Sequence, residues 1–223
     1  MPRTGERGGP QTRARILEVA TRLFVERGYD AVTVAEVARE AGVSSVTVFK
    51  HFPRKEDLFL DRADDAVDLL RSAVRDRAPG VDVLASLREA TLRLVDGRHP
   101  LSGANDRSVP FFRTVAASPA LVARAREIAA ELQLVLADEL ERDPAFEGDG
   151  ALLAAFFVAG YGTVLVETAR RRVAGEPPDA VVDDHRVRLE RLFDALRYGL
   201  TPTASAAAAA ATEVGEVGEV GEG

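Results

Sequence analysis

The order of helix-capping residues near the start of the chain restricts its fold more than any other feature. Thr33 followed three positions later by Glu36 forms a capping box, a pattern typical of a helix start. Gly42 predicts the end of that helix, because glycine tolerates the left-handed conformation common at a helix C-terminus. Ser44 is placed to cap a second short helix, which Pro53 stops. Two short helices joined by a tight glycine turn predict a helix-turn-helix.

Helical periodicity also dominates the rest of the chain, and no alternating strand pattern is convincing. A first helix is predicted up to Gly28, and a long helix is predicted from Pro53 to about Pro79. Later helices are predicted over about 83–95, 111–117, 119–142, 151–174 and 183–200, with a loop over 97–110. The predicted fold is all-α: an N-terminal three-helix helix-turn-helix DNA-binding domain, then a larger helical ligand-binding and dimerisation bundle.

Four segments follow from this pattern. Residues 1–11 are predicted to be a flexible basic leader, 12–60 the helix-turn-helix domain and 61–200 the helical regulatory domain. Residues 201–223 are of low complexity and are predicted to be a disordered tail. The leader and first helix carry basic residues that would either reach the DNA backbone or minor groove or simply be flexible. These residues are Arg3, Arg7, Arg13 and Arg15.

Composition argues against several classes of protein. The chain has no cysteine and only three histidines, which lie far apart in sequence, so no metal site is expected. It has no Ser/His/Asp order or phosphate-binding loop, so neither an enzyme nor a cofactor is expected. No secretory signal is seen at the N-terminus. The longest uncharged apolar run, Ala151–Val166, is shorter than the ~20 residues that cross a bilayer. A cytoplasmic protein without a membrane segment is therefore expected.

Charge is unevenly distributed along the chain. Residues 1–60 carry ten Lys or Arg against eight Asp or Glu, whereas the remaining residues carry nineteen against twenty-eight. The net charge of −7 therefore resides in the later part. Such asymmetry indicates different partners for the two parts. An acidic surface gains nothing from DNA, so the later part is predicted to serve regulation and dimerisation.

The second short helix carries side chains suited to the DNA major groove. Val48 and Phe52 lie four residues apart and are predicted to anchor the helix to its support. The residues predicted to project outward are hydrogen-bonding or cationic: Ser45, Thr47, Lys50 and His51. A helix that stands clear of the core with such groups is typical of a recognition helix.

The stretch from Thr33 to Leu58, TVAEVAREAGVSSVTVFKHFPRKEDL, resembles the DNA-binding module of the TetR family of bacterial regulators. That family runs from a capped "T…IA…AGVS" helix into a "T-L-Y-x-Y-F-x-x-K-E-x-L" segment. The resemblance is close over about residues 12–60 and extends further only through helix number and length. It implies a homodimer on a near-palindromic double-stranded DNA operator, with ligand-relieved repression as the expected mode.

The resemblance also implies roles for individual residues. Contacts to phosphate are implied for Thr33, His51 and Lys55, and positions along the groove for Ser44, Ser45, Thr47 and Lys50. Of these, Ser45 and Lys50 are the favoured contacts to base edges. Phe49 belongs to the same DNA-facing set but stands where the family usually has tyrosine, so the phenolic contact is missing. Val46 replaces a commonly small residue, and either crowds the backbone or contacts a thymine methyl.

The effector site is the least specified part of the chain. Five aromatic residues either line an apolar pocket between helices or belong to ordinary core: Phe111, Phe112, Phe156, Phe157 and Tyr161. His99 and Arg113 are candidate polar anchors beside Tyr161. This set favours a hydrophobic or amphipathic small-molecule effector. The resembled family pairs its last two helices between subunits, which here are the helices predicted over 151–174 and 183–200. Two alternatives remain: a ligand-dependent activator, and a helical protein–protein interaction module with a degenerate DNA-binding part.

Overall fold

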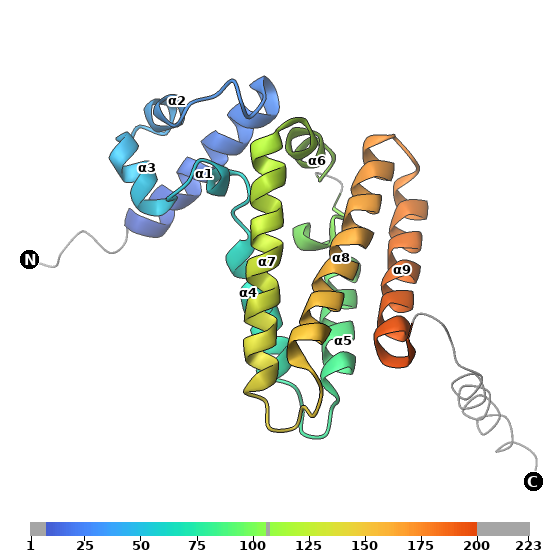
Figure 1. Cartoon of the computed structure of the whole chain (residues 1–223). Helices are drawn as coiled ribbons and strands as arrows, with labels where there is room; N and C mark the ends of the chain where they lie inside the picture. Colours follow the sequence, from blue (N-terminus) through green and yellow to red (C-terminus); the bar gives the residue numbers. More distant parts are fainter. Residues whose placement is uncertain (1–7, 106–107, 200–223) are drawn as a thin grey trace, which may run out of the picture.

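The computed structural model describes residues 8–105 and 108–199, and these residues fold into helices without a strand. The predicted tail therefore lies outside the described residues. Figure 1 shows an N-terminal group of three helices beside a bundle built from the later ones. The α-helices are α1 (Gly8–Arg27), α2 (Val34–Glu40), α3 (Ser45–His51), α4 (Ala63–Arg75), α5 (Val83–Asp96), α6 (Ser108–Ala117), α7 (Pro119–Glu141), α8 (Gly150–Val173) and α9 (Pro178–Tyr198). Two short 3₁₀ turns are η1 (Glu56–Leu58) and η2 (Pro100–Ser102).

Residues 8–62, which we call the N-terminal unit, form one small core. Apolar side chains from α1, α2 and α3 meet there, among them Ile16, Phe24, Val37, Val48 and Phe52, and each is almost completely buried. The predicted all-α fold with an N-terminal helix-turn-helix is confirmed. Helix α1 already begins at Gly8, so residues 8–11, predicted to belong to a flexible leader, are helical.

The prediction of a long helix from Pro53 is wrong. The chain instead makes the 3₁₀ turn η1, and α4 begins only at Ala63. The reason is that Leu58 and Phe59 are both buried in the core of the N-terminal unit, at 1% and 3% exposure. The backbone of Phe59 leaves the helical region, with φ −120° and ψ −35°. This bend lets the side chains of Leu58 and Phe59 both reach that core. Burial of two large side chains outweighs the preference for an uninterrupted helix.

Helices α4 to α9, which we call the helical body, form a second core. Helix α8 packs between α7 and α9, and α4 and α5 cover the other side of the bundle. Leu87, Leu136 and Leu140 are completely buried in this core. Gly160 lets α8 and α9 approach closely, because a Cβ atom there would lie 2.3 Å from Leu192 Cδ1.

Two further predictions of helix boundaries need correction. The stretch predicted as a loop over 97–110 contains η2 and the first turn of α6, which begins at Ser108. Helix α9 begins at Pro178 rather than near 183. Proline is well tolerated in the first turn of a helix, where no backbone N–H is needed, so the Pro177-Pro178 pair starts α9 rather than preceding it.

Candidate nucleic-acid interface

The capping box that starts α2 is complete. The Thr33 hydroxyl accepts a hydrogen bond from the Glu36 backbone N–H at 3.2 Å, and the Thr33 backbone N–H donates to Glu36 Oε2 at 2.8 Å. The backbone N–H of Thr33, followed by Arg27 at 2.8 Å, holds the pKa of Glu36 down at about 2. Thr33 is exposed, so its side chain lies at the surface at the N-terminus of α2.

Ser44 caps α3 as the sequence predicts. Its Oγ accepts the Thr47 backbone N–H at 3.1 Å, and the hydroxyls of Ser44 and Thr47 lie 2.9 Å apart in a mutual hydrogen bond. Gly42, at φ +66°, makes the turn between α2 and α3. Two of the three hydroxyls predicted to lie along the groove, those of Ser44 and Thr47, are therefore hydrogen-bonded to each other at the start of α3.

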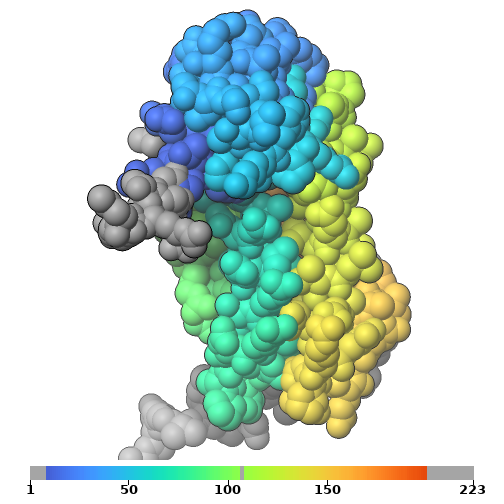
Figure 2. Space-filling model, turned by 90° about the vertical axis from the view of Figure 1, so that its left-hand side faces the viewer, coloured from blue at the N-terminus to red at the C-terminus, as the bar shows by residue number. Residues whose placement is uncertain are grey.

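Helix α3 stands outward from its support. Val48 and Phe52 point into the core at 1% and 2% exposure, as predicted. On the opposite side Val46 is 79% exposed and Phe49 is 49% exposed, and Lys50 is exposed with them. We call Val46, Phe49 and Lys50 the outer face of α3. In the space-filling view the N-terminal unit, in blue, sits at one end of the molecule above α4 and α7 (Figure 2).

The polar residues predicted to project outward flank this face. Ser45, Thr47 and His51 are partly buried, and none of the three is packed into the core. Val46 was considered only as a departure from a family pattern, yet it is the most exposed residue of α3 among the large apolar ones. The signal was present in the sequence, because anchors at 48 and 52 place positions 46 and 50 on the opposite side of a helix.

Lys55 is tied into the N-terminal unit. Its Nζ donates a hydrogen bond to the Tyr29 backbone carbonyl at 2.7 Å and lies 4.0 Å from the centre of the Tyr29 ring. Burial lowers the pKa of Lys55. The Tyr29 hydroxyl in turn donates to Glu56 Oε1 at 2.8 Å. Lys55 thus fixes the segment that leaves α3, in addition to the phosphate contact predicted for it.

The basic residues of α1 differ from one another. The Arg13 guanidinium lies 4.9 Å from the centre of the Phe52 ring, a cation–π contact that joins α1 to the end of α3. Arg15 is exposed. Arg3 and Arg7 lie outside the described residues.

Aromatic and polar contacts join the N-terminal unit to α6 and the start of α7. The rings of Phe59 and Phe111 stack with their centres 5.0 Å apart. The Ser118 hydroxyl, instead of capping α7, donates to Asp30 Oδ1 at 3.0 Å. Leu121 of α7 is completely buried in the core of the N-terminal unit. These residues make a direct joint between the two parts of the molecule.

An ion-pair cluster extends this joint along α7. Arg124 Nε donates to Asp57 Oδ1 at 3.2 Å, and Arg124 Nη1 donates to Glu131 Oε1 at 2.7 Å. Arg54, three residues after α3 ends, donates to Glu127 Oε2 at 2.5 Å. Asp57 also accepts the Arg54 backbone N–H at 3.2 Å. The segment that leaves α3 is thereby held against α7.

The five aromatic residues predicted to line an effector pocket lie in different surroundings. Phe111 belongs to the joint, whereas Phe157 is 4% exposed and packs in the helical body, 5.7 Å from Phe193 between ring centres. Phe112 packs near Gly103. Phe156 departs from the prediction, because it is 62% exposed on the outer side of α8 and does not face the interior.

The polar anchors suggested for the effector all make hydrogen bonds to the backbone of this chain. The Tyr161 hydroxyl donates to the Leu101 backbone carbonyl at 2.8 Å, and burial raises the pKa of Tyr161. His99 Nδ1 accepts the Leu101 backbone N–H at 3.2 Å and so caps η2. Arg113 donates to the Val173 backbone carbonyl at 3.5 Å. Together these contacts fasten the segment before α6, and α6 itself, to α8.

The chain resembles known proteins most strongly over the N-terminal unit. Residues 16–61 match the family model for bacterial regulatory proteins of the tetR family. The chain is 31% identical over 99 residues to the transcriptional regulator AcrR of Shigella flexneri, covering 43% of this chain and 46% of that protein. It is 40% identical over 65 residues to the transcriptional activator FasR of Mycolicibacterium smegmatis, covering 29% of this chain and 30% of that protein. The chain thus spans less than half the length of these curated relatives.

A solved structure matches nearly the whole fold. It is Thermus thermophilus FadR, a TetR-family transcriptional repressor determined in complex with lauroyl-CoA. The match covers 86% of this chain and 96% of that one, with a TM-score of 0.56 and 25% identity. The likeness therefore includes the helical body, which the sequence matches reach only in part.

Proposed function

The chain belongs to the TetR family of bacterial regulatory proteins, and from that premise we propose that it is a dimeric, ligand-responsive repressor that acts on DNA in the cytoplasm. One observation carries the proposal. Helix α3 is anchored by Val48 and Phe52 while Val46, Phe49 and Lys50 face solvent, which is the arrangement a recognition helix needs to enter the major groove.

We assign the contacts to DNA by exposure and charge. Lys50 is the cation on the outer face of α3 and is suited to guanine O6 and N7. His51 flanks the outer face and Thr33 lies exposed at the N-terminus of α2; both are assigned to phosphate, and Lys55 is assigned there as well. Ser44, Ser45 and Thr47 line the start of α3. The mutual hydrogen bond of Ser44 and Thr47 supports a positioning role for these two hydroxyls.

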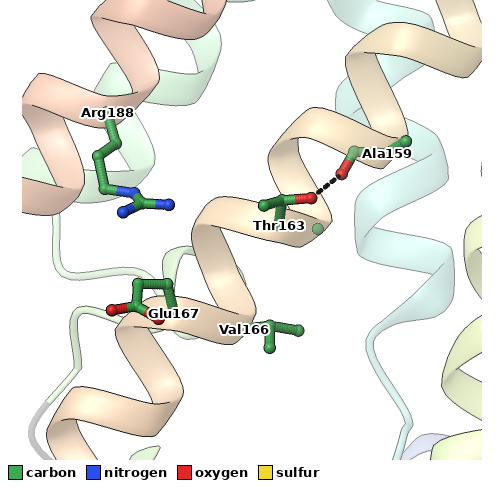
Figure 3. Close-up of a pocket in the computed structure, with 6 residues that line it drawn as sticks. Ala159, Thr163, Val166, Glu167 and Arg188 are labelled. Atoms are coloured by element: carbon green, nitrogen blue, oxygen red, sulfur yellow. Dashed lines mark hydrogen bonds between the residues drawn. The ribbon is translucent and has the colours of Figure 1, made fainter.

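The outer side of α8 supports the proposed dimer. Its exposed residues recur three and four positions apart and are mostly apolar: Leu152, Phe156, Ala159, Thr163 and Val166. Figure 3 shows the hollow beside this stripe, where Arg188 of α9 extends toward Glu167 of α8. Gly162 also lines the hollow, with no atom within 4 Å of the position of a Cβ, so it leaves space for a partner side chain. Two copies related by a two-fold axis would bury this surface on each other.

The dimer also accounts for the apolar character of α8. By length and composition alone this 24-residue helix could cross a membrane. Of its most apolar 18-residue stretch, 28% is buried within the described residues. One such helix is weak support for a membrane protein, and α8 lies between α7 and α9 in the bundle. Its exposed apolar residues are the ones that pairing with a second copy would cover.

The proposed operator follows from the dimer. A two-fold axis places two copies of α3 in successive major grooves, ~34–36 Å apart, so the site is near-palindromic. The effector is proposed to be hydrophobic or amphipathic, since the helical body is rich in aromatic residues near α6 and α8. The complex of Thermus FadR with lauroyl-CoA supports an acyl chain as a first candidate. The joint at Phe59, Phe111 and Arg124 offers a path by which effector binding can change DNA binding. A coupling free energy of ~1–3 kcal/mol between the two sites suffices.

A gel-shift assay with the DNA that flanks the gene of this protein tests the proposal. We expect a discrete complex with the flanking DNA, and release of the DNA by the effector. Lys50→Ala should weaken binding by about 1–3 kcal/mol because a contact to base edges is lost. Arg126→Ala, a change of the same charge at an exposed position of α7, is the matched control and should bind normally. Equal affinity for operator and random DNA would contradict the proposal.

A reporter gene under the flanking promoter decides the direction of regulation. Repression predicts that the reporter is expressed more strongly when the gene for this chain is deleted. It also predicts stronger expression when effector is added to the intact strain than without effector. Lower expression on deletion would instead assign the chain to the ligand-dependent activators. Retention of a partner protein without any DNA binding would favour the protein–protein interaction module.

A further inference from the structure

The outer face of α3 carries a chemistry that the proposed function does not specify. We propose that Val46, with Phe49 beside it, reads the 5-methyl group of a pyrimidine in the major groove, so that each half of the operator contains a thymine whose methyl packs on Val46. This inference deepens the proposed function and rests on it. It concerns which bases the recognition helix selects, rather than whether the chain binds DNA.

Exposure is the first observation behind this assignment. Val46 is 79% exposed, the highest fraction among the exposed large apolar side chains of the described residues. The described part of the chain leaves this side chain largely uncovered. A β-branched residue at this position gains nothing for a short helix by propensity. Its apolar surface is therefore available to a partner.

The second observation is which groups share that face. Val46 and Lys50 lie four positions apart and Val46 and Phe49 lie three apart, so the three side chains are neighbours on one side of α3. Both apolar side chains lack hydrogen-bonding groups. The nearby hydroxyls of Ser44 and Thr47 are already bonded to each other. The face thus offers an apolar surface with one cation, rather than a row of free donors and acceptors.

DNA presents one apolar group that suits such a surface. In the major groove the methyl on C5 distinguishes thymine from the other bases, and it packs against apolar side chains. Lys50 adds the positive charge that favours the adjacent phosphates or a guanine edge. An apolar side chain that approached only phosphates would lose hydration without gaining a contact. The base edge is therefore the assigned partner of Val46.

The test begins by selecting a bound duplex with the full-length chain from a random library of unmethylated double-stranded DNA. Each thymine of the selected half-site is then replaced in turn by deoxyuridine, which lacks the methyl but keeps the base pair. Burial of one methyl corresponds to roughly fourfold in Kd. We expect a weakening of about fourfold at one or two thymines, and no change at the others.

A double-mutant cycle links that methyl to Val46. Val46→Ala should weaken binding to the thymine duplex by roughly fourfold to tenfold and should then be insensitive to deoxyuridine at the same position. Val25→Ala, at an exposed valine of α1, is the matched control and should keep full sensitivity to deoxyuridine. Because Val46 is exposed, its removal leaves the core intact, so folding does not confuse the result.

The outcomes separate this inference from the proposed function. If no sequence is enriched in the selection, the proposed function fails and the inference fails with it. If a duplex is enriched but every deoxyuridine duplex binds as well as the thymine duplex, only the inference is overturned. An equal response of Val46→Ala and the intact chain to deoxyuridine would also overturn it.

The same methyl group occurs on 5-methylcytosine, so a separate experiment distinguishes thymine from 5-methylcytosine as the base that carries it. Duplexes with cytosine or 5-methylcytosine at the sensitive position are compared by titration. Tighter binding of the methylated duplex would support recognition of either methylated pyrimidine. Equal binding of the two, together with sensitivity to deoxyuridine, would support recognition of thymine alone.

Discussion

The N-terminal unit and the helical body differ in how their surfaces arise. In the N-terminal unit short-range signals fix α2 and α3, and the capping residues Thr33 and Ser44 form the predicted hydrogen bonds. In the helical body the helices are long, and what matters is which sides they turn toward one another. The exposed stripe of α8 and the joint at Phe111 come from packing between distant segments. The surface of the N-terminal unit thus depends on residues close together in the chain, whereas the surface of the helical body depends on how its helices pack.

The two parts also differ in charge, and that difference suits their proposed roles. The first sixty residues carry a small excess of positive charge, whereas the later residues are strongly acidic. In the proposed function, the negative charge of the later residues opposes their approach to the DNA backbone, and DNA is bound at the end of the molecule where α3 lies (Figure 2).

Phe52→Ala should unfold the N-terminal unit more readily than the helical body. The ring is 2% exposed and fills the core under α3, so its loss should lower the free energy of unfolding by about 3–5 kcal/mol. Denaturant unfolding followed by circular dichroism measures this change. Phe49→Ala, which removes the same ring from a half-exposed site, serves as the control and should cost far less. Equal losses for the two variants would contradict the burial described for Phe52.

Phe156→Ala should separate the subunits and leave each one folded. A central aromatic residue of an interface commonly contributes at least about 2 kcal/mol, which corresponds to roughly a thirtyfold rise in the dimer Kd. Analytical ultracentrifugation over a range of concentrations measures the change, and circular dichroism verifies the helices. Val25→Ala removes exposed apolar surface from α1 and should not change the dimer Kd. An unchanged Kd in Phe156→Ala would remove α8 from the proposed interface.

Arg124→Ala should loosen the joint between the two parts. The side chain is only 13% exposed and pairs with Asp57 and Glu131, so its loss should cost about 1–3 kcal/mol of stability. It should also weaken the effect of effector on DNA binding, which gel shifts with and without effector measure. Arg126→Ala on the same helix is the control. Full effector response in Arg124→Ala would exclude this cluster from the coupling.

Glu36→Gln should reduce the dependence of stability on acid. The pKa of Glu36 is lowered to about 2 in the folded chain, first by the Thr33 backbone N–H and then by Arg27. A carboxylate with a lowered pKa stabilises the fold above its unfolded pKa, and this contribution is lost as the pH falls toward about 2. Melting temperatures between pH 6 and roughly pH 2 should therefore fall less steeply in the variant. Parallel curves for the two proteins would contradict the lowered pKa of Glu36.

Local chemistry made much of the candidate site predictable. The capping box, the glycine turn and the Ser44 cap each depend on residues within a few positions of one another, so they could be identified before any coordinates. The inward direction of Val48 and Phe52 followed from their spacing. The placement of Val46 was available from the same spacing but was overlooked, because polar side chains were expected to dominate a DNA-binding surface.

The remaining errors share a physical cause. The start of α4 was misplaced because the burial of Leu58 and Phe59 in the core of the N-terminal unit bends the chain there. Phe156 and Phe157 are adjacent and both aromatic, yet one is exposed and the other buried. Composition treats them alike, and only the position of α7 and α9 around α8 distinguishes them.

Residues close together in the sequence were enough to predict α2 and α3, the direction of α3 and the separation of charge along the chain. These depend on hydrogen bonds within one turn and on side chains three or four positions apart. Only the tertiary structure decided that Phe111 and Arg124 join the two parts, that Lys55 is tied to Tyr29, and that α8 keeps an apolar side exposed. Such contacts bring together residues distant in the chain, and their energy depends on how whole helices pack.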